Sequence, residues 1–121
     1  LKEKNPEVKT FGAEPAESPV ITKDEKAPHK IQGWGPGFVP DNLDKSIVDE
    51  ILLVPGDEAI DFARRAAAEE GIITGISGGG ALQAAGQVAA RPESAGKTIV
   101  VVIADTGERY LSTALFKGLV D

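Results

Sequence analysis

The protein has 121 residues, enough for one domain or part of one. Its net charge of −6 argues against a nucleic-acid-binding or anionic-membrane-binding surface. The absence of cysteine and the single histidine, His29, exclude a disulfide framework, a thiolate nucleophile and a Cys- or His-rich metal site. The chain shows neither an apolar run long enough to span a membrane nor a signal peptide, so we expect a soluble protein of a reducing compartment.

Residues 1–7 are typical of the end of a helix, because basic side chains precede Pro6. The residues that would begin this helix are missing, so we expect the chain to be part of a longer protein. Alternating β-formers predict a strand from about Val8 to Ala13, followed by a polar loop over residues 16–30.

Residues 31–40 (IQGWGPGFVP) alternate glycine with aromatic or apolar side chains. Such a segment has little secondary structure of its own, and long loops of this kind are often functional. Two interpretations stay open: the loop packs on the core through Trp34 and Phe38, or it covers a ligand.

A strand is predicted over residues 48–54, ending before Pro55. We expect Asp57 to cap the helix that follows, and Gly71 to end it in the left-handed conformation. The apolar spacing of this helix predicts a buried stripe of Ala59, Phe62, Ala63 and Ala66.

The central stretch is residues 72–82, a short apolar strand that ends in Ser77 and three glycines, followed by a helix predicted over residues 81–90. Glycines there permit positive φ or a close approach by another group. The helix N-terminus supplies unpaired N–H groups and a positive dipole end. Ser77 therefore either presents its hydroxyl at the mouth of a cleft or simply caps the helix.

Residues 98–104 form a continuous β-branched run, which predicts a central parallel strand covered on both faces. A polar turn, Asp105–Thr106, follows it, and a short helix is predicted over residues 111–119. The alternation of strands and helices indicates an α/β layered sheet, whose ligands lie off the carboxyl ends of the strands. If the strands are neighbours, the turns at Ser77 and Asp105 share one crevice, although the sheet lacks partners for its edges.

Three motifs stand in the order and spacing of one enzyme family: residues 29–40 (HKIQGWGPGFVP), 75–81 (GISGGGA) and 107–113 (GERYLST). They resemble cysteine synthase, or O-acetylserine sulfhydrylase, a fold-type II pyridoxal-phosphate enzyme of the tryptophan synthase β-like group. The resemblance covers residues 1–119. It implies that residues 1–121 are the C-terminal portion of the large, cofactor-binding domain of that three-layer α/β fold, incomplete in this chain.

The resemblance implies a pyridoxal 5′-phosphate-dependent β-replacement, which makes L-cysteine from O-acetylserine and sulfide through an aminoacrylate. A serine hydroxyl facing the pyridine nitrogen suits a neutral ring, which favours β-elimination over transamination. The family's cofactor contacts fall on Ser77, Asp105 and Thr106, and its substrate loop on Gln32, Gly33 and Gly35.

The family's Schiff-base lysine, its substrate-carboxylate loop and its phosphate loop have no counterpart in this chain, and Lys30 belongs to a different motif. We therefore expect no catalytic residue here, and an inactive chain without the N-terminal remainder of the enzyme. The resemblance also implies a cytoplasmic homodimer and an interaction with serine acetyltransferase.

Alternatives remain within and outside this chemistry. Trp34 replaces the usual isoleucine, which leaves a cystathionine β-synthase or an O-phosphoserine sulfhydrylase open, while Pro36 stands where cystathionine β-synthases usually have tyrosine. A non-catalytic fragment that binds serine acetyltransferase is a further alternative. Two interpretations stay open for Glu108 and Arg109: a structural ion pair, or catalytic groups. A nucleotide-phosphate loop and a serine nucleophile at Ser77 are disfavoured, because the spacing of the glycines and the triad partners do not fit.

Overall fold

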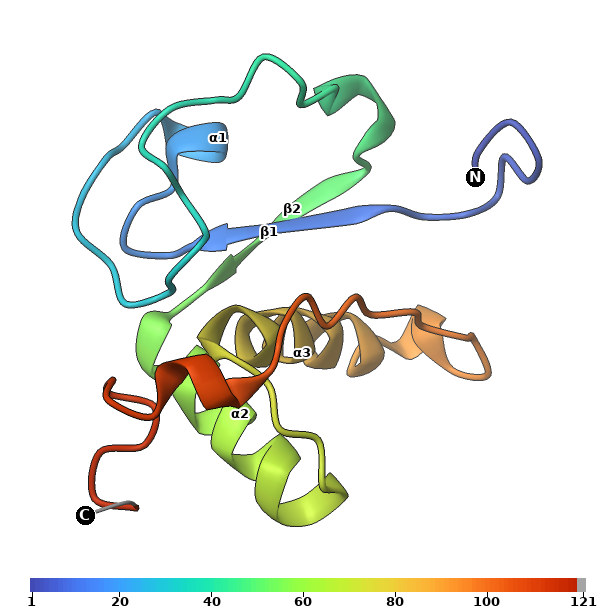
Figure 1. The fold of residues 1–121 in the computed structure, drawn as a ribbon. Helices are drawn as coiled ribbons and strands as arrows, with labels where there is room; N and C mark the ends of the chain where they lie inside the picture. Colours follow the sequence, from blue (N-terminus) through green and yellow to red (C-terminus); the bar gives the residue numbers. More distant parts are fainter. Residues whose placement is uncertain (120–121) are drawn as a thin grey trace.

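The computed structural model describes residues 1–119 as a small parallel sheet beside a pair of helices (Figure 1). The strands are β1 (Phe11–Pro15) and β2 (Glu50–Val54), paired in register with Ala13 opposite Leu52. A long connection over residues 16–49 joins them. The long helices are α2 (Gly56–Glu70) and α3 (Ile76–Ala89). The short helical segments are α1 (Val20–Lys23), η1 (Lys45–Ile47), η2 (Pro92–Ser94) and η3 (Gly107–Tyr110).

The predictions for β2 and α2 are largely confirmed. β2 ends at Val54, directly before Pro55, and Gly71 ends α2 with φ of 70°. The predicted cap Asp57 is wrong, since Pro55 occupies the N-cap position and Asp57 lies inside the first turn. The Glu17 carboxylate, from a distant segment, instead accepts a hydrogen bond from the Gly56 N–H at 2.8 Å.

The buried stripe of α2 is confirmed at three of its four positions. Ala59, Ala63 and Ala66 are buried, whereas Phe62 is only partly covered and its ring lies under the Arg65 guanidinium at 5.3 Å. Ile60, which the predicted stripe omitted, is buried instead. α3 packs on this stripe through Gly79, which meets Ala59 and Ala63.

α3 lies between α2 and the sheet and joins them through two glutamines. Gln83 donates a hydrogen bond to Glu58 in α2 at 2.6 Å, and Gln87 donates to the Leu53 carbonyl in β2 at 2.9 Å. Apolar side chains from all three elements form one core with Ile31 and Leu115. Its buried members are Ile31, Leu52, Val54, Ala59, Ile60, Ala63, Ile76, Ala84, Val88 and Leu115.

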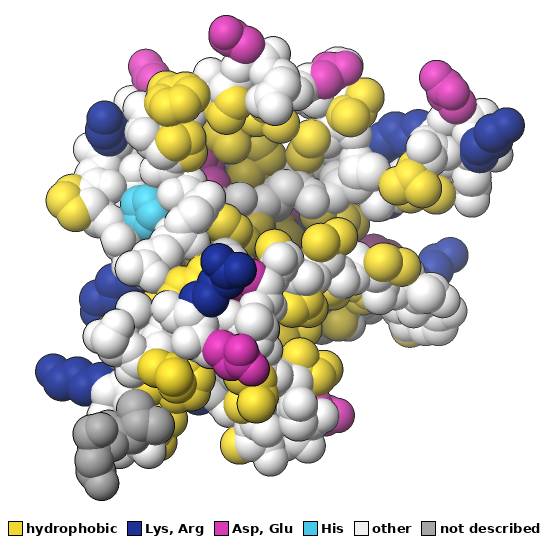
Figure 2. All heavy atoms as spheres, in the orientation of Figure 1, with side chains coloured by type: hydrophobic (Ala, Val, Ile, Leu, Met, Phe, Trp, Pro, Cys, Tyr) yellow, Lys and Arg dark blue, Asp and Glu magenta, His cyan; other side chains and the backbone are white. Residues whose placement is uncertain are grey.

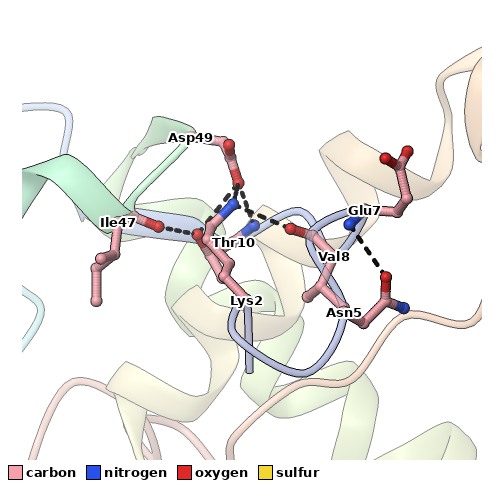
Figure 3. Close-up of polar contacts among 7 residues, drawn as sticks. All are labelled: Lys2, Asn5, Glu7, Val8, Thr10, Ile47 and Asp49. Atoms are coloured by element: carbon pink, nitrogen blue, oxygen red, sulfur yellow. Dashed lines mark hydrogen bonds and ion pairs between the residues drawn. The ribbon is translucent and has the colours of Figure 1, made fainter.

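β1 begins at Phe11, later than predicted. The residues before it are held to the segment before β2 by side-chain hydrogen bonds and by one backbone hydrogen bond, from the Asp49 N–H to the Thr10 carbonyl at 2.9 Å. Figure 3 shows the Asp49 carboxylate accepting from the Thr10 N–H at 2.7 Å and pairing with the Lys2 ammonium at 2.6 Å. The Thr10 hydroxyl donates to the Ile47 carbonyl. β1 also extends through Pro15, which is tolerated because β1 is an edge strand of this two-stranded sheet.

The prediction of a strand over residues 98–104 is wrong for the described residues, where this run is not in a strand. Val100 and Val102 are 87% and 78% exposed. The physical reason is that a strand needs a hydrogen-bonded neighbour, and the sheet of residues 1–119 contains only β1 and β2. Figure 2 shows hydrophobic side chains exposed across the middle of this face of the molecule.

Three other predicted elements differ. Residues 72–75 form no strand, and residues 111–119 are turns rather than a helix. α3 begins at Ile76, five residues before the predicted start at Ala81, because the glycines join its first turn. No helix in the described part of the chain combines the length and the hydropathy that crossing a bilayer requires.

Replacing Gly79 by alanine should destabilise the complete protein by about 1–3 kcal/mol, because overpacking a filled interface costs that much. A Cβ there would lie 2.1 Å from the Ala59 carbonyl oxygen and 2.7 Å from the Ala63 Cβ. Gly86→Ala is the matched control in the same helix, since its Cβ would lie 3.5 Å from the Phe62 ring. It should stabilise by about 0.5–1 kcal/mol through helix propensity. Equal unfolding free energies of the two variants in urea would contradict this packing.

The hydrogen bonds to the Asp49 carboxylate should make the free energy of unfolding depend on pH. Hydrogen bonds from Lys2 and Thr10 lower the pKa of Asp49 from 3.8 to about 2. A lowered folded-state pKa stabilises the fold above pH 3.8, and this contribution disappears as the pH falls through about 2. The unfolding free energy of Asp49→Asn should therefore fall below that of the unchanged protein at pH 5 and converge with it near pH 2. Asp41→Asn, at an exposed position, is the control, and a difference independent of pH would contradict the assignment.

Candidate functional site

The first turn of α3 places Ser77 in the second helical position, where its side chain is partly exposed. Gly75 is the N-cap residue, with φ of −72° and ψ of 177°, and no side chain caps this helix end. The interpretation of Ser77 as a helix cap is therefore wrong. Its hydroxyl stands beside the positive end of the helix dipole, where it is available to a ligand.

The glycines after Ser77 serve close packing rather than unusual backbone angles, since Gly78, Gly79 and Gly80 all have negative φ. A Cβ at Gly78 would lie 1.7 Å from the Thr74 hydroxyl oxygen. Gly79, as described above, meets the backbone of α2. These contacts fix the position of the turn that carries the Ser77 hydroxyl.

Gly80 faces the loop over residues 29–40. A Cβ on Gly80 would lie 2.9 Å from Cη2 of Trp34, so the indole rests directly on the helix. Gly80 follows Ser77 by three residues, and residues so spaced share one face of a helix. Trp34 therefore lies on the face of α3 that also carries Ser77.

The loop itself is held by His29. The His29 Nδ1 atom accepts a hydrogen bond from the Ile31 N–H at 3.2 Å, and its Nε2 atom lies 3.2 Å from the Gly35 carbonyl oxygen. A neutral ring with the proton on Nε2 satisfies both contacts. Three loop glycines take positive φ, as glycine allows at low cost: Gly33 at 89°, Gly35 at 53° and Gly37 at 85°.

Packing on the core is confirmed for Trp34 and wrong for Phe38, which is 61% exposed. Ile31, fully buried, is the anchor that the sequence interpretation omitted. Gln32 and Gly33, two of the predicted substrate-loop residues, are exposed on the same loop.

The turn at Asp105 lies against the residue that precedes α3, although the two strands that were expected to bring it beside Ser77 do not form. The Gly75 N–H donates to one Asp105 carboxylate oxygen at 3.1 Å, and the Gly107 N–H donates to the Ile73 carbonyl at 3.3 Å. Thr106 is exposed at this turn.

Sequence reasoning missed Tyr110, whose hydroxyl donates to the other carboxylate oxygen of Asp105. This hydrogen bond, together with burial, raises the pKa of Tyr110, so the phenol remains protonated as a donor. The predicted ion pair of Glu108 and Arg109 is wrong. Both side chains are exposed on η3, and the ion pairs found within residues 1–119 join other residues.

The Lys30 side chain forms an ion pair at the start of α2 and not at Ser77. Its ammonium lies 2.5 Å from an Asp57 carboxylate oxygen, and this contact raises the pKa of Lys30. A lysine held in its charged form is a poor nucleophile for a carbonyl group.

A family described as "Pyridoxal-phosphate dependent enzyme" matches residues 1–105. The chain belongs to this family. A cysteine synthase of Haemophilus influenzae is 50% identical over 119 residues, and cysteine synthase 3 of Caenorhabditis elegans is 44% identical over 121 residues. These matches cover 93% and 100% of this chain but 38% and 36% of the relatives, so the chain spans just over a third of their length.

The crystal structure of a cysteine synthase from Entamoeba histolytica superposes with a TM-score of 0.95 at 45% identity. The match covers 97% of this chain and 35% of that one. The fold is thus part of the fold-type II arrangement of pyridoxal-phosphate enzymes.

The residues at the start of α3 fit this cofactor. The Ser77 side chain is partly exposed, and its hydroxyl is a neutral donor suited to a pyridine nitrogen. The glycines that follow it pack closely against neighbouring segments.

The contact between Gly80 and Trp34 predicts a fluorescence change. Gly80→Ala should push the indole off α3 and into water, shifting the emission of Trp34, the sole tryptophan of residues 1–121, to longer wavelength. The measurement subtracts the spectrum of a matched Trp34→Phe variant, which removes any signal from the remainder of the complete protein. Gly86→Ala is the control on the same helix, and an unchanged difference spectrum for Gly80→Ala would contradict the contact.

Proposed function

We propose that this chain is the C-terminal portion of the cofactor-binding domain of a cysteine synthase, converting O-acetylserine and sulfide to L-cysteine and acetate. The observation that carries the proposal is the Ser77 hydroxyl in the first turn of α3, bordered by Trp34 and the Asp105 turn. The similarity to cysteine synthases across nearly the whole chain supports the same reaction.

When bound, pyridoxal phosphate withdraws electrons from the substrate and so permits acetate to leave its β-carbon and sulfide to take its place. The residues of this chain would hold one edge of the cofactor. Ser77 would donate a hydrogen bond from its hydroxyl to the ring nitrogen, and Asp105 and Thr106 would border the ring from the neighbouring turn. A neutral donor leaves the ring nitrogen unprotonated, whereas a carboxylate in its place would favour the protonated ring.

The loop over residues 29–40 would border the substrate. Gln32, Gly33 and Gly35 offer backbone and amide groups there, and the His29 contacts keep the loop in place. The indole of Trp34 narrows this side of the site, which favours a small acceptor such as sulfide over a bulky thiol. This narrowing supports cysteine synthase over the alternative that we propose second, a cystathionine β-synthase.

The lysine that bonds to the cofactor would come from the rest of the enzyme. Within this chain Lys30 is paired with Asp57, and we propose that the chain alone is inactive. A cytoplasmic homodimer that associates with serine acetyltransferase is the corresponding proposal for the complete enzyme.

Ser77→Ala in the complete enzyme should retain the cofactor and lower kcat/KM for O-acetylserine about tenfold, since a lost hydrogen bond is worth roughly 1.4 kcal/mol. Ser77→Asp should favour the protonated ring and shift the pH profile of the elimination half-reaction. Ser46→Ala, on η1, is the control. Stopped-flow absorbance with O-acetylserine separates this half-reaction from sulfide addition.

Unchanged kinetics for both Ser77 variants would remove this residue from the site. A preference of the complete enzyme for serine with homocysteine over O-acetylserine with sulfide would support the cystathionine β-synthase alternative instead.

A further inference from the structure

Both oxygens of the Asp105 carboxylate are used within the protein. One accepts the Gly75 N–H at 3.1 Å, and the other accepts the Tyr110 hydroxyl. The carboxylate thus joins the residue before α3 to η3, across thirty positions of sequence. A carboxylate held in this way has little capacity left for a ligand.

The atoms around Gly75 leave no room for a side chain at this position. A Cβ at Gly75 would lie 2.5 Å from Asp105 Oδ1 and 2.5 Å from Cε2 of Tyr110, so the carboxylate and the ring both press on the backbone of the N-cap residue. A second link, from the Gly107 N–H to the Ile73 carbonyl, holds the same two segments together. Since Ser77 follows Gly75 by two residues, any movement of Gly75 moves the Ser77 hydroxyl.

We propose that Asp105 is a positioning residue, which, clamped by Tyr110, fixes the backbone at Gly75 and thereby aims the Ser77 hydroxyl at the ring nitrogen of the cofactor. The carboxylate also lies at the positive end of the α3 dipole, where negative charge is favourable. This inference rests on the proposed function for the identity of the ligand, while the clamp itself rests on contacts within the chain.

The test uses the complete protein and three substitutions. Asp105→Ala removes both hydrogen bonds, and Tyr110→Phe removes one of them. Asp105→Asn is the rescue variant, because its amide oxygen accepts from Gly75 and its NH₂ group donates to the Tyr110 oxygen. Glu108→Gln is the matched control, since it removes a carboxylate charge at an exposed position of the same turn.

Two readouts are needed: hydrogen exchange at the amides of residues 75–79 in the cofactor-free protein, and the Kd of pyridoxal phosphate from an absorbance titration. Asp105→Ala should speed exchange at these amides and raise the Kd about tenfold, as expected when the hydrogen bond from Ser77 to the ring nitrogen is lost. Tyr110→Phe should give a smaller change in the same direction, and Asp105→Asn and Glu108→Gln should resemble the unchanged protein.

A Kd for Asp105→Ala equal to that of the unchanged protein, whatever its melting temperature, would reduce Asp105 to a structural role and overturn the inference. A Kd for Asp105→Asn as high as that for Asp105→Ala would also overturn it, because the charge itself would then act on the cofactor. If the unchanged protein took up no pyridoxal phosphate, the proposed function would fail, while the exchange rates would still show whether Asp105 holds the start of α3.

Discussion

The absence of side chains at Gly78, Gly79 and Gly80, in the first turns of α3, is the constraint on which the rest of the structure depends. Gly79 lets the backbone of α3 reach the Ala59 carbonyl of α2, and Gly80 lets the Trp34 indole rest on the same turn. A methyl group at either position would separate elements that now share one core. The close approach also leaves Ser77 as the polar side chain of that turn, bordered by segments far apart in the sequence.

This constraint links folding to chemistry. A hydroxyl is a weak and flexible ligand by itself, because its proton rotates freely. Its usefulness to a cofactor depends on a backbone that does not move. Here the backbone is held by α2 on one side, by the loop over residues 29–40 on another, and by Asp105 at the helix end. Membership of the pyridoxal-phosphate-dependent enzyme family gives this rigid turn its proposed ligand.

The elements that could be predicted from sequence are those whose signals are local. Gly71 ended α2 as expected because its left-handed conformation depends only on neighbouring residues. The apolar run over residues 98–104 was predicted to be a strand, and this prediction was wrong. Strand pairing depends on a partner that no local pattern reveals. The three glycines were noticed, yet their partners Thr74, Ala59 and Trp34 could not be predicted from spacing. The family motifs predicted that Ser77 and Asp105 belong to one site. The hydrogen bond from Tyr110 to Asp105 depends on the folded structure and could not be predicted from the sequence.

The most direct test of the central claim is a crystal structure of the complete protein with pyridoxal phosphate bound, in which the distance from the Ser77 Oγ atom to the ring nitrogen is measured. The account predicts a hydrogen bond of about 2.7–3.2 Å, with the first turn of α3 packed on Ala59 and Trp34 as described here. A ring nitrogen that contacts a different side chain, with the Ser77 hydroxyl turned away from the cofactor, would contradict it.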